Sequence, residues 1–165
     1  MSDGPSLVAL IPRLRRYARA LVGDRAAADD LVQDTLERAW AKLHLFRQGT
    51  DLRAWLFTVM HNVHVNQVRA ARPTDALEDE MPELAQRAVQ GDALLVRDLE
   101  RALAALPAAQ REVLLLVALE DLSYEETANV LGIPIGTVMS RLARAREKLR
   151  VLMTGKGGTK LQVVK

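Results

Sequence analysis

The chain has 165 residues, 49% of them hydrophobic and only 4% aromatic, which argues against strand-rich sandwiches and barrels and favours an all-α fold of one or two small domains. It contains no cysteine, so disulfides, thiolate metal sites and a cysteine nucleophile are excluded. The net charge is +2, from 23 cationic and 21 acidic side chains, and the order of these charges along the chain is more informative than their sum.

Three helices are predicted in the first 72 residues. The first spans 6–22, with Pro12 either in its first turns or shifting its start, the second spans 24–43, and the third runs from Asp51 until Pro73 stops it. Apolar side chains at helical spacing predict which positions are buried. These are Leu7, Leu10, Ile11, Leu14, Ala18 and Leu21 in the first helix, Val32, Leu36, Leu43 and either Ala39 or Trp40 in the second, and Leu52, Trp55, Leu56, Val59 and Val63 in the third.

The second predicted helix carries a dense polar surface close to its N-terminal half. Acidic side chains in the first turns favour the helix dipole, which is sufficient to explain Asp29 and Asp30 but less sufficient for Asp34 and Glu37. A partner-binding face is the other interpretation, and it would consist of Asp30, Gln33, Asp34, Glu37 and Arg38.

The end of the third helix, HNVHVNQVRAAR, is rich in amide, imidazole and guanidinium groups, which can contact bases and phosphates or simply be solvated. His61 and His64 are three residues apart, a spacing that could place two metal ligands on one helix face. Neither an HExxH arrangement nor a third ligand accompanies them, so the sequence predicts no metal site and no cofactor. No Ser, His and Asp set indicates nucleophilic catalysis, and an enzyme is not expected.

Residues 73–92 differ in composition from the segments on either side, with Asp or Glu at six positions, two prolines and a single Arg87. This composition predicts a flexible acidic linker. Beyond it a helix is expected over 92–106, and Pro107 opens the next one. A second core is expected to centre on Val113, Leu114, Leu116 and Val117.

Residues 123–150 are predicted to form a helix-turn-helix. Ser123 and Glu126 have the spacing of a capping box, and Gly132 and Pro134 mark the turn between the two helices. The second helix begins near Ile135 and should bury Val138, Leu142, Ala145 and Leu149. From Gly136 to Arg150 it holds five cationic side chains and one acidic one, which suits DNA but also fits a solvated basic face on an ordinary bundle.

The last twelve residues, TGKGGTKLQVVK, do not have the spacing of a phosphate-binding loop and are interpreted as a flexible basic tail. Neither a signal peptide nor a membrane-spanning apolar run is expected, because Pro12 and the arginines after it interrupt the N-terminal apolar segment. A cytoplasmic location without membrane insertion is therefore predicted.

Together these segments resemble the RNA polymerase sigma factors of the extracytoplasmic function (ECF) type, which keep only sigma regions 2 and 4. The resemblance covers about residues 6–150 and is carried by DLVQDTLERAW with DLRAWLFTVMHNVHVNQVRA, and by LPAAQREVLLLVALEDLSYEETANVLGIPIGTVMSRLARAREKL. It implies an all-α chain of two small helical domains. Region 2 would cover 1–72, region 4 would cover 93–153 with its helix-turn-helix, and the acidic linker 73–92 would join them before a basic tail at 154–165.

The resemblance also implies partners and site residues. Core RNA polymerase would be bound through its β′ clamp helices and its β flap, promoter DNA at the −10 and −35 elements, and an anti-sigma factor is a usual further partner of the family. Met139 and His61 depart from the family, because a cationic residue is common at each position. The implied residues are Asp30, Gln33, Asp34 and Glu37 for the clamp helices, Phe46, Gly49, Trp55, Asn62 and Asn66 for the −10 element, and Thr137, Met139, Ser140, Arg141, Arg144 and Arg146 for the −35 element.

Two other interpretations are compatible with parts of the chain. A stand-alone regulator of the LuxR type would need a dimer face and would bind duplex DNA without polymerase. An adaptor that only sequesters a partner would keep its function after an Arg144→Ala substitution. Promoter binding that is weak for the chain alone and tight with core polymerase would favour the sigma factor over both.

Overall fold

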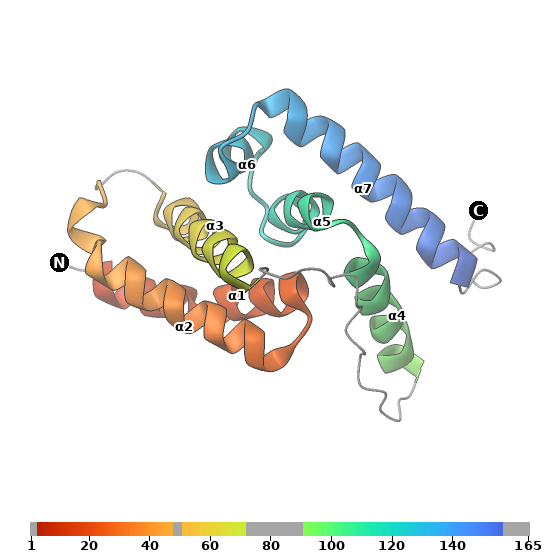
Figure 1. Cartoon of the computed structure of the whole chain (residues 1–165), viewed down its shortest axis with the longest axis horizontal. Helices are drawn as coiled ribbons and strands as arrows, with labels where there is room; N and C mark the ends of the chain where they lie inside the picture. The colour runs from red at the N-terminus through yellow and green to blue at the C-terminus, as the bar shows by residue number, and fades with distance from the viewer. Residues whose placement is uncertain (1–2, 48–50, 72–90, 157–165) are drawn as a thin grey trace.

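The computed structural model describes residues 3–47, 51–71 and 91–156, and within these ranges it contains helices and no strand, which confirms the predicted all-α class (Figure 1). Two helical units follow one another along the chain and pack together. The first comprises α1 (Asp3–Val22), α2 (Arg25–Ala41) and α3 (Leu52–Ala71), and the second comprises α4 (Gly91–Ala105), α5 (Ala108–Leu114), α6 (Tyr124–Leu131) and α7 (Ile135–Lys156).

The first unit forms because each helix has an apolar face and a defined start or stop. Gly23 ends α1 with a φ of 73°, a left-handed conformation in which a residue with a side chain would be strained. The Asp24 carboxylate then accepts a hydrogen bond from the amide of Ala27 at 2.9 Å and so caps α2. Helix α1 begins three residues earlier than expected, and Pro12 therefore lies inside it, beyond its first turns.

The core of the first unit matches the predicted stripes in most positions and extends beyond them. Of the two alternatives in α2, Ala39 is fully buried and Trp40 is 64% exposed. Tyr17 and Phe57 were not among the predicted core residues, yet both are buried, with their rings edge to face and the centroids 5.0 Å apart. The predicted positions that are buried are Leu7, Leu14, Ala18, Leu21, Val32, Leu56, Val59 and Val63.

The second unit is built around α5, which packs on α7 and continues into a single π-helical turn, Leu115–Leu119. Predicted core residues Val113, Leu114 and Leu116 are buried there, and Val117 is partly buried. The chain then leaves the turn through Asp121, whose φ of 55° lies in the left-handed region. This bend directs residues 120–122 toward the first unit.

Three expectations concern residues outside, or at the edge of, the described ranges. Gly49 and most of the predicted linker 73–92 are outside them, and α4 begins at Gly91. The predicted tail begins at Thr154, but α7 continues to Lys156, with the Thr154 hydroxyl donating to the carbonyl of Arg150 at 2.6 Å. The helix therefore extends three residues into the predicted tail, and its Thr154 side chain bonds back to the preceding turn.

Candidate nucleic-acid and partner surfaces

The helix-turn-helix is assembled by local interactions that the sequence predicts. Glu126 donates its amide to the Ser123 hydroxyl at 2.9 Å, and its carboxylate accepts from the Ser123 amide at 2.8 Å, so the capping box is complete. Gly132 ends α6 in the left-handed conformation, with φ 67° and ψ 38°. The carbonyl of Pro134 accepts from Thr137 and Val138 and so starts α7. The turn therefore fixes how α7 is presented.

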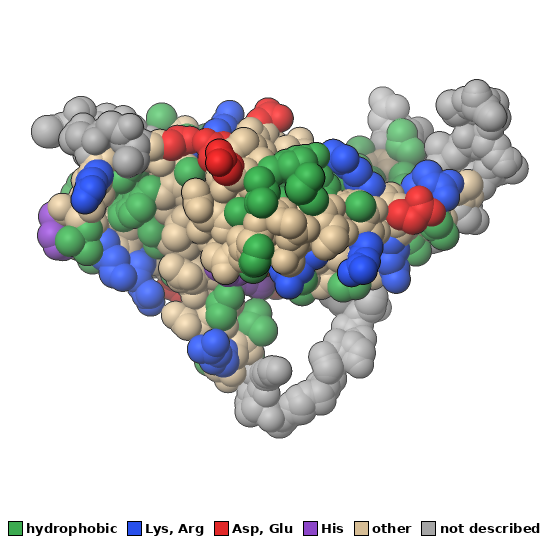
Figure 2. All heavy atoms as spheres, turned by 90° about the horizontal axis from the view of Figure 1, so that it is seen from above, with side chains coloured by type: hydrophobic (Ala, Val, Ile, Leu, Met, Phe, Trp, Pro, Cys, Tyr) green, Lys and Arg blue, Asp and Glu red, His purple; other side chains and the backbone are tan. Residues whose placement is uncertain are grey.

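One face of α7 is buried and the opposite face is open. Val138, Leu142 and Ala145 are at most 2% exposed, which holds the helix against the rest of its unit. Figure 2 views the molecule from the side on which α6 and α7 lie, and it shows lysine and arginine side chains along the α7 end of this face, with an acidic one among them. Of the six predicted −35 residues, the exposed ones are Met139, Ser140, Arg144 and Arg146, and the partly buried ones are Thr137 and Arg141.

The arginines of α7 differ in whether they are already paired. Arg150 donates to both carboxylate oxygens of Glu147, at 3.3 and 2.7 Å, and this hydrogen bond and charge lower the pKa of Glu147. By contrast, Arg141, Arg144 and Arg146 form no ion pair with any residue in the described part of the chain. These three guanidinium groups are therefore available to an anionic ligand.

The predicted −10 residues lie on and beside α3. Phe46 packs on Trp55 with ring centroids 5.3 Å apart, and both side chains are partly buried. Asn62 and Asn66 follow Trp55 by seven and eleven residues on the same helix, so the three lie along one stripe, and both amides are exposed. The structure thus brings together four of the five predicted residues, and the fifth, Gly49, is outside the described ranges.

A cavity of about 470 Å³ opens beside the two aromatic rings. Its walls from the first unit include Phe46, Trp55 and Thr58. The remaining walls come from α6, through Glu126, Asn129 and Val130. The second unit therefore stands directly against the predicted −10 surface.

The structure contains the polar face predicted on α2, and a side chain of α3 positions two of its carboxylates. The Gln67 amide donates to Asp34 at 2.7 Å and to Asp30 at 3.4 Å. Gln33 and Glu37 are exposed on the same helix. Sequence reasoning did not find the role of Gln67, because nothing in its local pattern reports a contact 33 residues away.

Trp40 adds a large apolar side chain to this surface. It is 64% exposed, and it follows Gln33 by seven residues, so it continues the stripe of Gln33 and Glu37 toward the end of α2. Tryptophan is enriched in protein-binding surfaces relative to the rest of the protein surface.

The two units meet at Glu120, a carboxylate that is only 1% exposed. Arg16 of α1 donates to both of its oxygens, at 3.3 and 3.1 Å, and Arg13 lies 3.8 Å from one of them. Arg53 of α3 donates to the Glu120 carbonyl at 3.1 Å and lies 4.0 Å from Glu126. Three arginines of the first unit therefore surround one residue of the second.

His61 makes a second contact across the same boundary. Its Nδ1 lies 2.6 Å from a carboxylate oxygen of Glu112 in α5. The neighbouring His64 is partly buried. Its pKa is lowered chiefly by burial, with Glu112 opposing this shift and His61 and Arg111 adding to it. One of the two histidines that had the spacing of metal ligands in the sequence, His61, thus contacts a carboxylate of the other unit. The described residues contain no group of three or more potential metal ligands.

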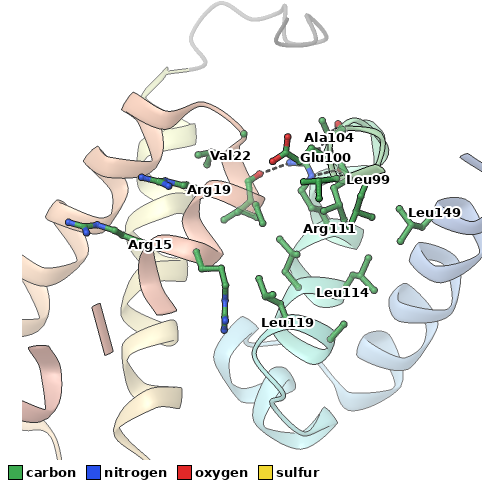
Figure 3. A pocket seen from close by; sticks show the side chains of 18 of the residues that line it. Arg15, Arg19, Val22, Leu99, Glu100, Ala104, Arg111, Leu114, Leu119 and Leu149 are labelled. Carbon is green, nitrogen blue, oxygen red and sulfur yellow. Dashed lines mark hydrogen bonds between the residues drawn. The ribbon is translucent and has the colours of Figure 1, made fainter. Parts of the chain in front are cut away.

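A groove of about 1180 Å³ separates α1 from α4 and α5 (Figure 3). Arg111 forms part of its floor and joins the two sides, because it donates to the carbonyl of Leu21 at 2.9 Å and to the carbonyls that end α4. Burial lowers the pKa of Arg111, although the group remains a cation at neutral pH. Arginines line the α1 side of the groove, namely Arg15, Arg16 and Arg19. Apolar side chains cover much of the rest, among them Val96, Leu99, Leu103 and Leu149.

No helix in the described ranges is long and apolar enough to cross a membrane. This finding concerns only residues 3–47, 51–71 and 91–156.

Comparisons with known proteins match each of the two units to a sigma-factor domain. Residues 7–61 match the model of the sigma2 domain of PhyR, and residues 97–149 match the model of sigma-70 region 4. The ECF RNA polymerase sigma factor EcfG of Rhodopseudomonas palustris is 40% identical over 149 residues, which cover 89% of this chain and 82% of that protein. SigL of Mycobacterium tuberculosis, another ECF sigma factor, is 37% identical over 157 residues, covering 89% and 86%.

Two solved structures are similar over nearly the whole chain. The sigma factor RpoE of Bartonella quintana, in complex with the anti-sigma factor NepR, superposes with a TM-score of 0.75 and 34% identity over 93% of this chain and 98% of its own. CnrH in complex with the cytosolic domain of CnrY gives a TM-score of 0.69 and 29% identity over 92% and 87%.

Proposed function

The chain belongs to the ECF family of RNA polymerase sigma factors, and from this membership we propose which of its surfaces perform each part of the work. As a sigma factor it binds core RNA polymerase and directs transcription initiation at promoters. Sigma factors are not enzymes, and the LuxR-type alternative has no support, since both matched models are sigma-factor domains. We assign region 2 to residues 1–72 and region 4 to residues 93–153.

The −35 element is read, in this proposal, by the open face of α7. The observation that carries the assignment is that Arg141, Arg144 and Arg146 form no ion pair within the described residues, on a helix whose opposite face is fixed in the core. A guanidinium can donate two parallel bonds to O6 and N7 of guanine in the major groove. Thr137 and Ser140 would contact bases or phosphates, and Met139 would contact an apolar edge such as the thymine methyl group.

The −10 element is held by the surface around Phe46 and Trp55, together with Gly49, Asn62 and Asn66. Opening a base pair costs a few kcal/mol, and stacking an extruded base on an aromatic ring offsets part of that cost. The two rings lie side by side at the edge of a cavity large enough for a base, which supports this assignment. The exposed amides farther along α3 would bond the separated strand.

Core polymerase is bound through α2. Asp30 and Asp34 are held in place by Gln67, so their carboxylates are positioned before a cationic partner arrives. Gln33 and Glu37 belong to the same surface, and we add Trp40 as its apolar anchor because few exposed side chains can bury as much area.

The groove between the two units is proposed as the site of an anti-sigma factor. RpoE and CnrH are both in complexes with such proteins. The apolar floor and the arginines on the α1 side would suit an amphipathic helix with acidic residues along one edge. A transcription factor of this kind works beside the chromosome, in the cytoplasm.

Run-off transcription with purified bacterial core polymerase tests the function directly. The chain should direct initiation from a subset of genomic promoter fragments and should bind those fragments weakly without core enzyme. An adaptor or a stand-alone regulator would give no run-off product, and tight promoter binding by the isolated chain would contradict the assignment.

A further inference from the structure

Met139 is the most exposed methionine in the described part of the chain. Its side chain is 50% exposed, whereas Met60 is 1% exposed in the core of the first unit and Met153 is partly buried near the end of α7. Met1 and Met81 lie outside the described ranges. Because the chain has no cysteine, its sulfur groups are all thioethers, and Met139 places one of them in the open on the helix proposed to read the −35 element.

The position of Met139 puts it beside the part of α7 that can approach DNA most closely. Gly136, Ser140 and Ala143 lie on one exposed stripe of the helix, and their small side chains leave little bulk between its backbone and a DNA groove. Met139 borders this stripe on one side and Arg144 borders it on the other. These residues belong to the N-terminal half of α7, and the N-terminal residues of a recognition helix are the ones that contact base edges.

Ile135 extends the apolar character of the border on which Met139 lies. It precedes Met139 by four residues, so the two side chains share one side of α7, and it is 45% exposed. Two exposed apolar side chains match the C5 methyl group of thymine, which is the apolar group that bases present in the major groove. Burying one methyl group in such a contact corresponds to about a fourfold gain in affinity.

We propose that Met139 is a site of reversible oxidation, at which an added oxygen weakens recognition of the −35 element by removing an apolar contact with a thymine methyl group. The proposal rests on the assignment of α7 to the −35 element. Hypochlorous acid is an oxygen-atom donor suited to this step: the thioether sulfur forms a bond to its oxygen, the O–Cl bond breaks, and chloride and a proton are released. The sulfur gives up two electrons, which leave on the chloride. Methionine sulfoxide reductases restore the thioether, releasing the oxygen as water at the expense of a dithiol reductant.

The sulfoxide changes what this border of α7 can contact. It is polar where the thioether was apolar, and an S–O group placed against a methyl group loses its water without gaining a hydrogen bond. The lost methyl contact and this desolvation together should make promoter binding at least about fourfold weaker. The fold should not change, because α7 is anchored through Val138 and Leu142, which are at most 2% exposed.

Limited oxidation of the full chain, followed by assembly with core polymerase, tests the proposal. Hypochlorous acid is added in limiting amount, peptide mass spectrometry identifies the methionines that carry an added oxygen, and fluorescence anisotropy measures binding to labelled promoter fragments. Oxidised wild type should bind at least about fourfold more weakly and should recover after treatment with sulfoxide reductases. Met139→Leu keeps the apolar volume without the sulfur, so oxidation should not weaken its binding. The matched control Met153→Leu keeps Met139 and should respond as wild type does.

The outcomes separate this proposal from the proposed function. A wild-type chain in which Met139 carries the added oxygen but binding is unchanged would overturn the proposal, and so would a chain in which Met139 resists the oxidant. An equal loss of affinity in oxidised Met139→Leu would also overturn it, because another group would then be responsible. An unoxidised wild-type holoenzyme that does not distinguish −35 sequences would instead refute the assignment of α7.

Replacing thymine by uracil in the DNA locates the methyl contact. Uracil lacks only the C5 methyl group, so a series of fragments with one replacement each in the −35 element should include a position at which unoxidised wild type binds about fourfold more weakly. At that position oxidation should have a smaller further effect than on the thymine fragment, and Met139→Leu should keep its preference for thymine. If oxidation weakened binding equally on every fragment of the series, the sulfoxide would not act through a thymine methyl group and the proposal would fall.

Discussion

Replacing Arg144 by Ala separates DNA recognition by α7 from its structural role. The side chain is exposed and has no ion-pair partner among the described residues, so its removal leaves the fold nearly unchanged. Alanine is also the best helix former, and surface substitutions of this type usually change stability by less than about 0.5 kcal/mol. Any loss of promoter binding would therefore come from a lost DNA contact.

The expected loss follows from the chemistry of the contact. A bidentate guanidinium–guanine pair is worth about 1–3 kcal/mol of discrimination. At about 1.4 kcal/mol for each factor of ten, this corresponds to roughly a 5- to 150-fold weaker promoter complex. If Arg144 instead contacts a phosphate, binding weakens equally on all sequences and the slope of log affinity against log salt concentration falls by about 0.9.

Fluorescence anisotropy of the holoenzyme on labelled promoter fragments distinguishes these cases. The loss for Arg144→Ala should be concentrated at one base pair of the −35 element and should be absent on fragments that already carry a substitution there. Arg150→Ala is the matched control, because Arg150 lies on the same helix but is engaged with Glu147 in an exposed pair that contributes little. If the two variants bound every promoter equally well, the assignment of α7 as the reading helix would be wrong.

Three further predictions address the polymerase surface, the core and the pH response. Trp40→Ala should weaken core polymerase binding by about 2 kcal/mol or more in a surface-immobilised binding assay, as for a central interface tryptophan, while Val8→Ala, equally exposed on α1, should not; equal effects would remove Trp40 from the interface. Leu142→Ala should lower the free energy of unfolding by about 2–5 kcal/mol in urea titrations, because it leaves a cavity under α7; a loss below about 1 kcal/mol would show that α7 is not anchored there. Burial lowers the pKa of His64, so the unfolded chain takes up a proton first and stability should fall as the pH drops below 6.5; His64→Gln should reduce this dependence between pH 7 and 5.5, and an unchanged slope would refute the cause.

The helix-turn-helix was predictable because its determinants are close together in the chain. Ser123 and Glu126 form the predicted capping box, and Gly132 takes the left-handed conformation that its position required. In α2 the apolar pattern allowed either Ala39 or Trp40 to be buried, and only the packing of α2 on its neighbours decides for Ala39. Periodicity thus defines a helix face to within about one residue.

The contact between the two units could not be predicted in this way. Arg16 and Glu120 are 104 residues apart, and each looks like an ordinary exposed charge on its own helix. Glu112 is likewise 51 residues from His61, so the sequence offered the histidines as possible metal ligands and gave no sign of their partner. The residues proposed to contact DNA follow local patterns, whereas those that join the two units depend on the tertiary fold.

The groove between α1 and α4 depends on the packing of the two units. Arg15 and Arg19 on one side of the groove belong to α1 of the first unit, and Val96 and Leu99 on the other belong to α4 of the second unit, so the groove exists only while the units are together (Figure 3). A ligand that fills the groove would favour the packed arrangement of the two units over any arrangement in which they are apart. If a second partner bound the two units only when they are apart, linkage would require each partner to lower the affinity for the other by the same factor, even where their binding surfaces do not overlap. An anti-sigma factor in this groove would therefore reinforce the contact centred on Glu120 that the two units already make.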